Sequence, residues 1–274
     1  MLDLQEYEIG EHRITCPSCG RGGRDKTAGI KVEHDRAVLH CFRCGNVESF
    51  HADRAVVRRA SCIKAKATVQ QHTTLSDWGK SLWASTQELS GVALDYLGAR
   101  RCYAPPYGDL RWHPALKHPS GHTGPALVAL ITDIHTNEPL SLHRTWITAT
   151  GKADIDTPRL LLGNHAIEGG VIRLTPDDEV SALLGIAEGI ETALSLAWAP
   201  LPVWATIDAG HLSKFPVLRG IRTLYISQDQ DAAGIAAATT CASRWASAGK
   251  EVFVTQQSRN DLNDEIMGAK QNER

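Results

Sequence analysis

Two aspartates, Asp229 and Asp231, follow an apolar run at residues 224–226 that is typical of a buried strand. Like charges held close together repel, and each carboxylate loses its hydration when it is buried. Residues two apart share one face of an extended chain, so both carboxylates are expected to point the same way. We therefore expect a cation to lie between them.

Further acids follow other strand-like segments. Glu188 comes directly after the apolar run 182–187, and Asp261 and Asp264 follow a strand-like segment near the C-terminus. In an open α/β sheet, ligands bind beyond the carboxyl ends of the strands, and converging carboxylates are ligands for Mg²⁺ or Mn²⁺. The nearby Glu191 is interpreted instead as a first-turn acid that the helix dipole favours.

Four of the seven cysteines form two CxxC pairs that are spaced like metal ligands. Each pair turns tightly enough to aim two sulfurs at one ion, and four thiolates leave no open coordination position. The spacing predicts one structural zinc ion, and the glycine after each pair fits a sharp bend. The odd cysteine count favours a reducing cytoplasm over a secreted disulfide scaffold. The predicted ligands are Cys16, Cys19, Cys41 and Cys44.

Basic side chains, among them Arg43, surround the cysteine pairs and predict contacts with phosphates and base edges. Acidic residues are interleaved with them, so an ordinary solvated face is the alternative. The net charge is −2, so any nucleic-acid binding must use local patches. The sequence has no apolar run of about 18 residues, and its acidic N-terminus predicts no secretory signal.

Strand-like and helix-like segments alternate from residue 181 onward. Such alternation predicts βαβ units around a mostly parallel sheet. The expected strands are 182–187, 202–208, 223–230 and 251–256, and the expected helices are 189–199 and 232–249.

The preceding hundred residues predict a mixture of helices, a hairpin and a loop. Ser76 can cap the first helix, and many Pro, Gly and His residues at 105–124 indicate a loop. The expected helices are 75–89 and 93–102, the hairpin strands 125–134 and 139–148, and a further strand 169–176.

Three motifs together resemble the Toprim domain of primases, topoisomerases and related nucleases. They are "IAEGIETALSL", "ISQDQDAAG" and "RNDLNDEI", and the resemblance covers roughly residues 181–268. With an N-terminal four-cysteine ribbon, the arrangement resembles a bacteriophage- or plasmid-type DNA primase. The segment "LHRTWITATGKAD" is similar to the middle part of such primases, although Ile147 stands where leucine is usual.

The resemblance implies a fold of three parts. These are a Rossmann-like α/β Toprim domain with a mostly parallel sheet, an α+β primase subdomain and a small β zinc ribbon. The expected boundaries are 1–53 for the template-binding ribbon, 54–75 for a basic linker, 76–180 for the subdomain and 181–274 for the Toprim domain.

The resemblance also implies synthesis of short RNA primers on single-stranded DNA from nucleoside triphosphates. Glu188, Asp229, Asp231 and one of Asp261 and Asp264 would hold Mg²⁺ or Mn²⁺, and Glu188 is either a ligand or a general base. Triphosphate and template need facing cations. Arg144 and Lys152 are the first candidates, with Arg159 and Arg173 behind them.

Two other functional classes stay open. Toprim domains also occur in nucleases, and a catalytically inactive DNA-binding replication accessory protein is the third possibility. The sequence contains no Walker A motif, so a replicative helicase is expected as a separate partner.

Overall fold

The structure is a computed structural model that describes residues 7–20, 26–33, 36–51 and 71–269. The chain divides into two compact units, Met1–Thr68 and Val69–Arg274. Most of the linker predicted at 54–75 lies outside the described residues, and the predicted domain boundaries stay predictions. Among the helices described, none is long and apolar enough to cross a lipid bilayer.

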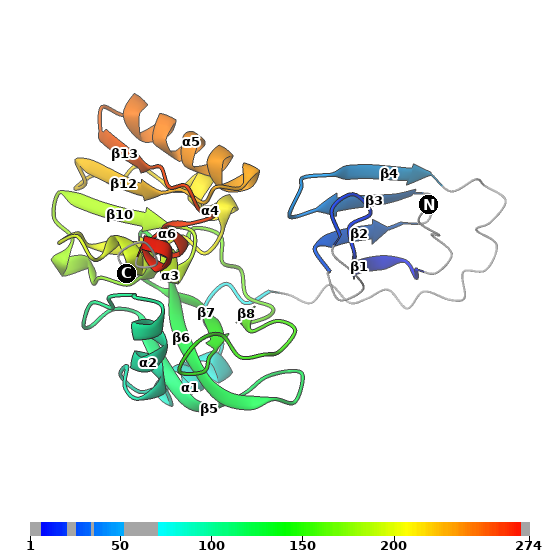
Figure 1. Cartoon of the computed structure of the whole chain (residues 1–274), viewed down its shortest axis with the longest axis horizontal. Helices are drawn as coiled ribbons and strands as arrows, with labels where there is room; N and C mark the ends of the chain where they lie inside the picture. The colour runs from blue at the N-terminus through cyan, green and yellow to red at the C-terminus, as the bar shows by residue number, and fades with distance from the viewer. Residues whose placement is uncertain (1–6, 21–25, 34–35, 52–70, 270–274) are drawn as a thin grey trace. The chain divides into compact units, whose positions relative to one another are not determined.

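The first unit is a small antiparallel sheet in the order β1-β2-β3-β4 (Figure 1). Buried and exposed residues alternate along β2 and β3, as expected for strands with one face on a core. Ile30, Leu39, Cys16 and Cys41 meet in that core, which contains few other large side chains. The strands are β1 (Gly10–Ile14), β2 (Ala28–Val32), β3 (Arg36–Cys41) and β4 (Val47–His51).

The C-terminal part of the second unit contains four parallel strands in the order β13-β12-β10-β11, which confirms the mostly parallel sheet predicted there. Two apolar cores lie against this sheet, one including α3 and the other including α4 and α5 (Figure 1). The elements are β10 (Leu183–Ala187), α3 (Ile190–Leu196), β11 (Val203–Ala205), α4 (Ala209–Lys214), β12 (Thr223–Ser227), α5 (Ala232–Ser247), β13 (Glu251–Thr255) and α6 (Leu262–Ala269).

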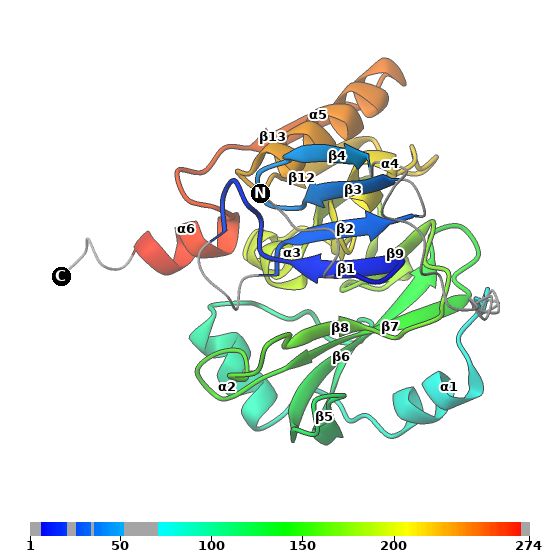
Figure 2. The ribbon, with the colours of Figure 1, turned by 90° about the vertical axis from the view of Figure 1, so that its right-hand side faces the viewer.

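The parallel strands continue into an antiparallel half. The short strand β9 pairs with β11 on one side and β6 on the other, so nine strands form one sheet. Figure 2 shows β6, β7 and β8 side by side. The remaining elements are α1 (Asp77–Ala84), α2 (Val92–Ala99), β5 (Leu110–Lys117), β6 (Thr123–Asp133), β7 (Pro139–Trp146), β8 (Arg159–Leu161), β9 (Gly170–Arg173) and the 3₁₀ turn Asp177–Glu179.

The structure confirms the predicted hairpin of β6 and β7, and Ser76 caps α1 by accepting a hydrogen bond from the Gly79 amide. The loop predicted at 105–124 is wrong, because β5 occupies much of it and pairs with β6. Leu110 and Trp112 of this strand are buried. The register shifts between His113 and Leu116, around a proline that cannot donate to the ladder. This irregularity interrupts the alternating pattern of the strand, which is why the sequence predicted a loop here.

Arg173 lies at the junction of the two halves of the sheet. Its side chain is buried, donates to the carbonyl oxygens of Asp133 and Ile134 at 3.2 and 3.1 Å, and also binds the Thr132 hydroxyl. The guanidinium lies 4.8 Å from the centre of the Trp204 ring. All these partners belong to the sheet and its turns, so Arg173 ties the sheet together instead of facing triphosphate.

Arg173→Met should lower the free energy of unfolding by about 2–4 kcal/mol, because buried carbonyl groups lose their charged donor. Urea unfolding monitored by tryptophan fluorescence measures the change. Arg219→Met is the matched control, since Arg219 is exposed. An equal midpoint in both variants would contradict this role for Arg173.

Candidate functional site

The sulfur atoms of Cys16, Cys19, Cys41 and Cys44 all lie within 4.8 Å of one another. Two of the separations are 3.7 Å, between Cys16 and Cys44, and 3.6 Å, between Cys19 and Cys41. Four sulfurs at about 2.3 Å from a tetrahedral zinc ion are about 3.8 Å apart. The cluster therefore fits one zinc ion, as the CxxC spacing predicts.

The turns that carry these sulfurs are shaped by hydrogen bonds and by glycine. The amide of Gly20 donates to the Cys16 carbonyl at 2.9 Å, and that of Gly45 to the Cys41 carbonyl at 3.0 Å. Gly45 has a φ of +69°, which glycine adopts readily. At Gly20 the reason is space, because a Cβ atom would lie 2.5 Å from the Cys16 carbonyl oxygen.

The ribbon surface beside the cluster is both basic and aromatic. The Arg13 guanidinium lies 4.3 Å from the centre of the Phe42 ring, and His40 packs edge-on against the same ring. These side chains line a groove together with Lys31 and Arg36, both of which pair with Glu33. Arg43 is exposed outside the groove lining and donates to the Cys19 carbonyl at 3.4 Å.

An acidic cavity of about 280 Å³ lies beyond the carboxyl ends of β10 and β12 in the second unit. Five carboxylates and three cations line it, so negative charge predominates. The acids are Glu188, Glu191, Asp208, Asp229 and Asp261, and the cations are Arg100, Lys152 and Arg159.

Glu188 directly follows β10, and its Oε1 atom is buried with no hydrogen-bond partner in the described part of the chain. Burial raises the pKa of Glu188 to about 8, and the charges of Asp229, Asp231 and Asp208 add to the effect. A carboxylate in this state gains stability from any added cation.

Asp229 follows β12 and resembles Glu188 in its surroundings. Its Oδ1 atom is buried without a partner among the described residues. Burial and the charges of Asp261 and Asp231 together raise the pKa of Asp229 to about 7, although Arg159 opposes them. Gly234 lets α5 approach, because a Cβ atom there would lie 2.7 Å from the Asp229 carbonyl oxygen.

Asp231 does not share the environment of Asp229. It is exposed and caps α5, with Oδ1 accepting a hydrogen bond from the Gly234 amide at 2.8 Å. β12 ends at Ser227, so the two aspartates are not alternate residues of a strand, and strand periodicity does not support the same-face expectation. Asp231 still acts on the site through its charge, which raises the pKa of both Glu188 and Asp229.

The structure separates Asp261 from Asp264. Asp261 lines the cavity and accepts a hydrogen bond from the Asp264 amide at 2.8 Å, whereas Asp264 lies 3.7 Å from Arg100 and outside the lining. Asn263 between them is fully buried and donates to the Arg100 carbonyl at 2.7 Å and to Ser195 at 3.0 Å. This anchor fixes the start of α6 beside the cavity.

Four cations were predicted to face the acids, and one of them, Arg173, instead ties the sheet together. The other three have different positions. Lys152 and Arg159 line the cavity. Arg144 is buried away from the cavity lining, donates to the Leu161 carbonyl at 2.9 Å and lies 5.5 Å from the centre of the Trp146 ring. The structure thus brings Lys152 and Arg159 to the acids but not Arg144.

Sequence reasoning missed Arg100 and Asp208, and it placed Glu191 correctly in the first turn of a helix but missed its burial and its partner. Glu191 is a first-turn acid that is also buried and paired with Lys152. Asp208 ends the segment after β11, so the strand-end rule that found Glu188 could have found it. Arg100 follows α2, and no sequence pattern pointed to it as a residue of the site. Its Nε atom is buried without a partner in the described residues.

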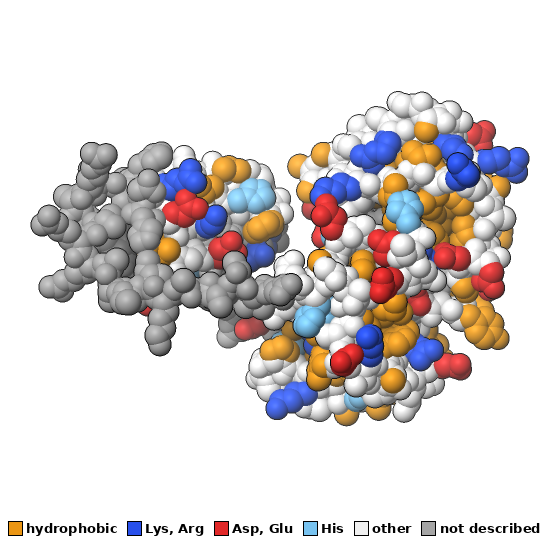
Figure 3. All heavy atoms as spheres, turned by 180° about the vertical axis from the view of Figure 1, so that it is seen from behind, with side chains coloured by type: hydrophobic (Ala, Val, Ile, Leu, Met, Phe, Trp, Pro, Cys, Tyr) orange, Lys and Arg blue, Asp and Glu red, His pale blue; other side chains and the backbone are white. Residues whose placement is uncertain are grey.

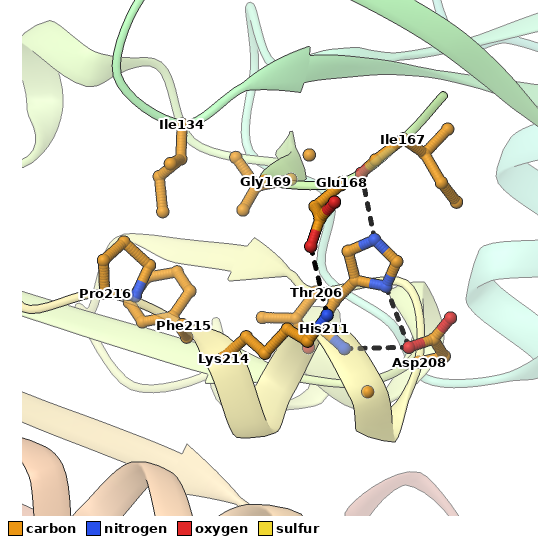
Figure 4. A pocket seen from close by; sticks show the side chains of 13 residues that line it. Ile134, Ile167, Glu168, Gly169, Thr206, Asp208, His211, Lys214, Phe215 and Pro216 are labelled. Carbon is orange, nitrogen blue, oxygen red and sulfur yellow. Dashed lines mark hydrogen bonds and ion pairs between the residues drawn. The ribbon is translucent and has the colours of Figure 1, made fainter. Parts of the chain in front are cut away.

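A tight turn and a histidine fix Asp208. Ile207 has a φ of +77°, and the Asp208 amide donates to the Thr206 carbonyl at 2.9 Å, which together make a strained γ-turn. Figure 4 shows the His211 ring between the Asp208 carboxylate and the Ile167 carbonyl oxygen, at 2.8 and 2.9 Å. These bonds orient Asp208 between the acidic cavity and the pocket of Figure 4.

The acidic cavity fits divalent metal by the chemistry of its donors. Two buried carboxylate oxygens lack partners, and acids outnumber cations. Glu188 and Asp229 would hold Mg²⁺ or Mn²⁺, with Asp261 and Asp208 nearby. Among the described residues, only the cysteine cluster brings three or more potential ligand atoms within 4.8 Å of one another.

Two family models match successive segments of the second unit. Residues 73–174 match a domain of unknown function (DUF7146). Residues 183–270 match the Toprim domain. These residues form a Toprim domain. The match confirms the resemblance predicted from the three acidic motifs. No curated protein matches the chain.

Solved primase structures resemble the chain only weakly. The primase fragment of the bacteriophage T7 primase-helicase protein is 16% identical, with a TM-score of 0.46 over 94% of this chain and 95% of that one. The zinc-binding and RNA polymerase domains of the Aquifex aeolicus primase are 14% identical, with a TM-score of 0.47 over 95% and 76%. Likeness at this level carries no argument about function.

Purified protein should contain about one zinc ion per chain, because four thiolates complete a tetrahedral site. Cys41→Ser should lose the metal, whereas Cys241→Ala should keep it. The Toprim domain should stay folded in Cys41→Ser, since neither of its cores contains any of the four ligands. Elemental analysis and circular dichroism measure both results, and protein isolated without zinc would contradict the site.

Binding of Mn²⁺ by the Toprim domain should tighten as the pH rises from 6 to 9. Glu188 and Asp229, with pKa values of about 8 and 7, must lose protons before they bind an ion. The gain should approach about tenfold per pH unit for each proton released. Calorimetric titration in two buffers of different ionisation heat counts these protons. Affinity that does not change with pH would count against both ligands.

Proposed function

We propose that the chain is a DNA primase that makes short RNA primers on single-stranded DNA by metal-dependent nucleotidyl transfer. The observation that carries this proposal is the acidic cavity of the Toprim domain, where unpartnered carboxylates face Lys152 and Arg159. A nucleoside triphosphate brings several negative charges, which require both divalent metal and fixed cations. A cavity that offers the two together suits that substrate.

Four of the lining acids and two of the lining cations have proposed tasks in this reaction. Divalent metal at Glu188 and Asp229 would stabilise the attacking 3′-hydroxyl and the leaving pyrophosphate. Lys152 and Arg159 are placed to contact the phosphates of the nucleotide. In the alternative role, Glu188 does not bind the metal but accepts the proton of the attacking hydroxyl. Asp208 and Asp261 add negative charge that favours metal over further anions.

The ribbon supplies a second surface for nucleic acid. The groove beside the cysteine cluster combines the stacked pair Arg13 and Phe42 with Lys31 and Arg36. Aromatic and guanidinium planes stack on unpaired bases, and the cations contact phosphates. We infer that this groove contacts the single-stranded template, with Arg43 at its margin. A separate replicative helicase is the further partner that we infer.

The overall charge distribution agrees with local rather than global contact to nucleic acid. Acidic and basic side chains are interspersed on the face of the second unit in Figure 3, and the net charge is −2. Template binding should therefore depend on the groove and the cavity. We also infer a cytoplasmic location, where the cysteines that bind zinc stay reduced.

A Toprim nuclease is the second candidate, because the same carboxylates could promote cleavage. The four-cysteine ribbon and the cations that face the acids favour synthesis. Labelled ribonucleotide incorporation on single-stranded DNA separates the two activities when full-length DNA is followed in the same reaction. Loss of full-length DNA without incorporation would overturn the primase proposal.

Asp229→Asn should abolish primer synthesis, because an amide does not supply the charge that binds metal. The variant should also unfold at a higher temperature than wild type, by about 2–4 °C at pH 8 and less at pH 5. The reason is that the raised pKa of Asp229 makes its ionisation oppose folding increasingly as pH rises above about 4. Primer yield and thermal unfolding at both pH values measure the effects.

Asp178→Asn is the matched control for this substitution, since Asp178 is exposed and lies outside the cavity lining. It should keep wild-type activity and the wild-type dependence of stability on pH. Primer synthesis by Asp229→Asn at the wild-type rate would defeat the metal-site assignment.

A further inference from the structure

Glu191 and Lys152 form an ion pair in the wall of the acidic cavity. Glu191 lies in the first turn of α3, three residues after Glu188, and only 8% of its surface is exposed. Its Oε1 atom is 3.2 Å from the Lys152 ammonium and accepts a hydrogen bond from the Tyr96 hydroxyl at 2.7 Å. A buried carboxylate with two such partners is fixed in position.

The charges of this pair are stable. Burial alone would raise the pKa of Glu191, but the Lys152 charge and the Tyr96 hydrogen bond outweigh it and lower the pKa to about 2. Glu191 is therefore ionised near neutral pH and pairs with the Lys152 ammonium. An ammonium has three donors, and Glu191 occupies one of them.

The backbone of Lys152 is held as firmly as its side chain. Ile147 and Lys152 form an antiparallel bridge, and the Thr148 amide donates to the Gly151 carbonyl at 2.7 Å. The next residue, Ala153, is buried and donates to the Trp146 carbonyl at 2.9 Å. Lys152 thus extends from a tight turn, and its long side chain ends at Glu191.

We propose that Glu191 is a positioning residue, which holds the Lys152 ammonium at the cavity wall so that an incoming nucleoside triphosphate meets a fixed cation. The inference rests on the proposed function for the identity of the ligand. A free lysine side chain loses rotamer freedom when it binds phosphate, whereas Lys152 has already lost it to Glu191. The pair therefore prepares the cavity for triphosphate before it binds.

The substitution Glu191→Gln separates positioning from simple charge. It removes a negative charge from the cavity, so electrostatics alone would tighten the binding of an anion. Positioning predicts the opposite, about three- to tenfold weaker binding, because Lys152 becomes mobile. Glu138→Gln makes the same change in net charge at an exposed residue outside the cavity and should leave binding unchanged.

A double-mutant cycle tests whether Glu191 acts through Lys152. The dissociation constant of ATP with Mg²⁺ is measured by calorimetry for wild type, Glu191→Gln, Lys152→Met and the double variant. If Glu191 acts only through Lys152, the double variant should bind ATP as weakly as Lys152→Met and no more weakly. Tighter binding by Glu191→Gln, or additive losses in the double variant, would overturn the proposal.

Thermal unfolding supplies the second readout. Lys152→Met leaves the buried Glu191 without its cation and should unfold at a lower temperature, and Glu191→Gln in the same chain should restore part of the loss. If Lys152→Met does not fold, Glu191→Gln and its control Glu138→Gln still decide the question. Weaker ATP binding by Glu191→Gln than by Glu138→Gln supports the proposal, and equal or tighter binding overturns it.

The outcomes also separate this inference from the proposed function. ATP binding that shows the predicted cycle, in a protein that makes no primers, would leave the positioning role intact and refute the primase. Primer synthesis by a protein whose double variant shows additive losses of ATP binding would support the primase and refute the positioning role. Wild-type protein that neither makes primers nor binds ATP would refute both.

Discussion

Carboxylates gathered in a partly buried cavity cannot all remain ionised unless positive charge lies beside them. Much of the second unit can be understood from this constraint. Glu188 and Asp229 have raised pKa values because burial and neighbouring acids oppose their charge. Glu191, at an even more buried position, has a lowered pKa because Lys152 is its direct partner. The same cavity therefore contains one satisfied acid and two that need a cation.

The cations come from the part of the chain that matches a domain of unknown function, and all five acids come from the Toprim domain. β9 makes this arrangement possible, because it pairs with β11 of the Toprim domain and with β6 of the preceding segment. Lys152 follows β7 and Arg159 begins β8 in the same continuous sheet. The facing charges are thus fixed by backbone hydrogen bonds within one body.

The sequence predicted the parts that depend on local pattern. The CxxC spacing located the cysteine cluster, and the apolar runs located the parallel strands and the acids that follow them. It failed where tertiary contacts decide the outcome. Nothing in its sequence context distinguishes Glu191 from a solvated first-turn acid, since Tyr96 and Lys152 are distant in sequence.

The same limit explains two other differences. Arg144 and Lys152 lie in one family-like segment, but only the structure shows that Arg144 turns toward the Leu161 carbonyl. Asp231 was paired with Asp229 by strand periodicity, which stops applying once β12 ends at Ser227. A period-2 argument holds only within the strand.

The ladder between β9 and β11 has a consequence for how such a chain can evolve and be synthesised. The two matched segments meet at paired backbone groups, Arg173 with Trp204 and Ile172 with Ala205, and not at a flexible tether. A ribosome must deliver residue 205 before the middle of the sheet can close, and until then β9 presents an unpaired edge that invites association with other chains. Gene fusions that exchange either half would inherit that edge, so the halves are expected to be exchanged together.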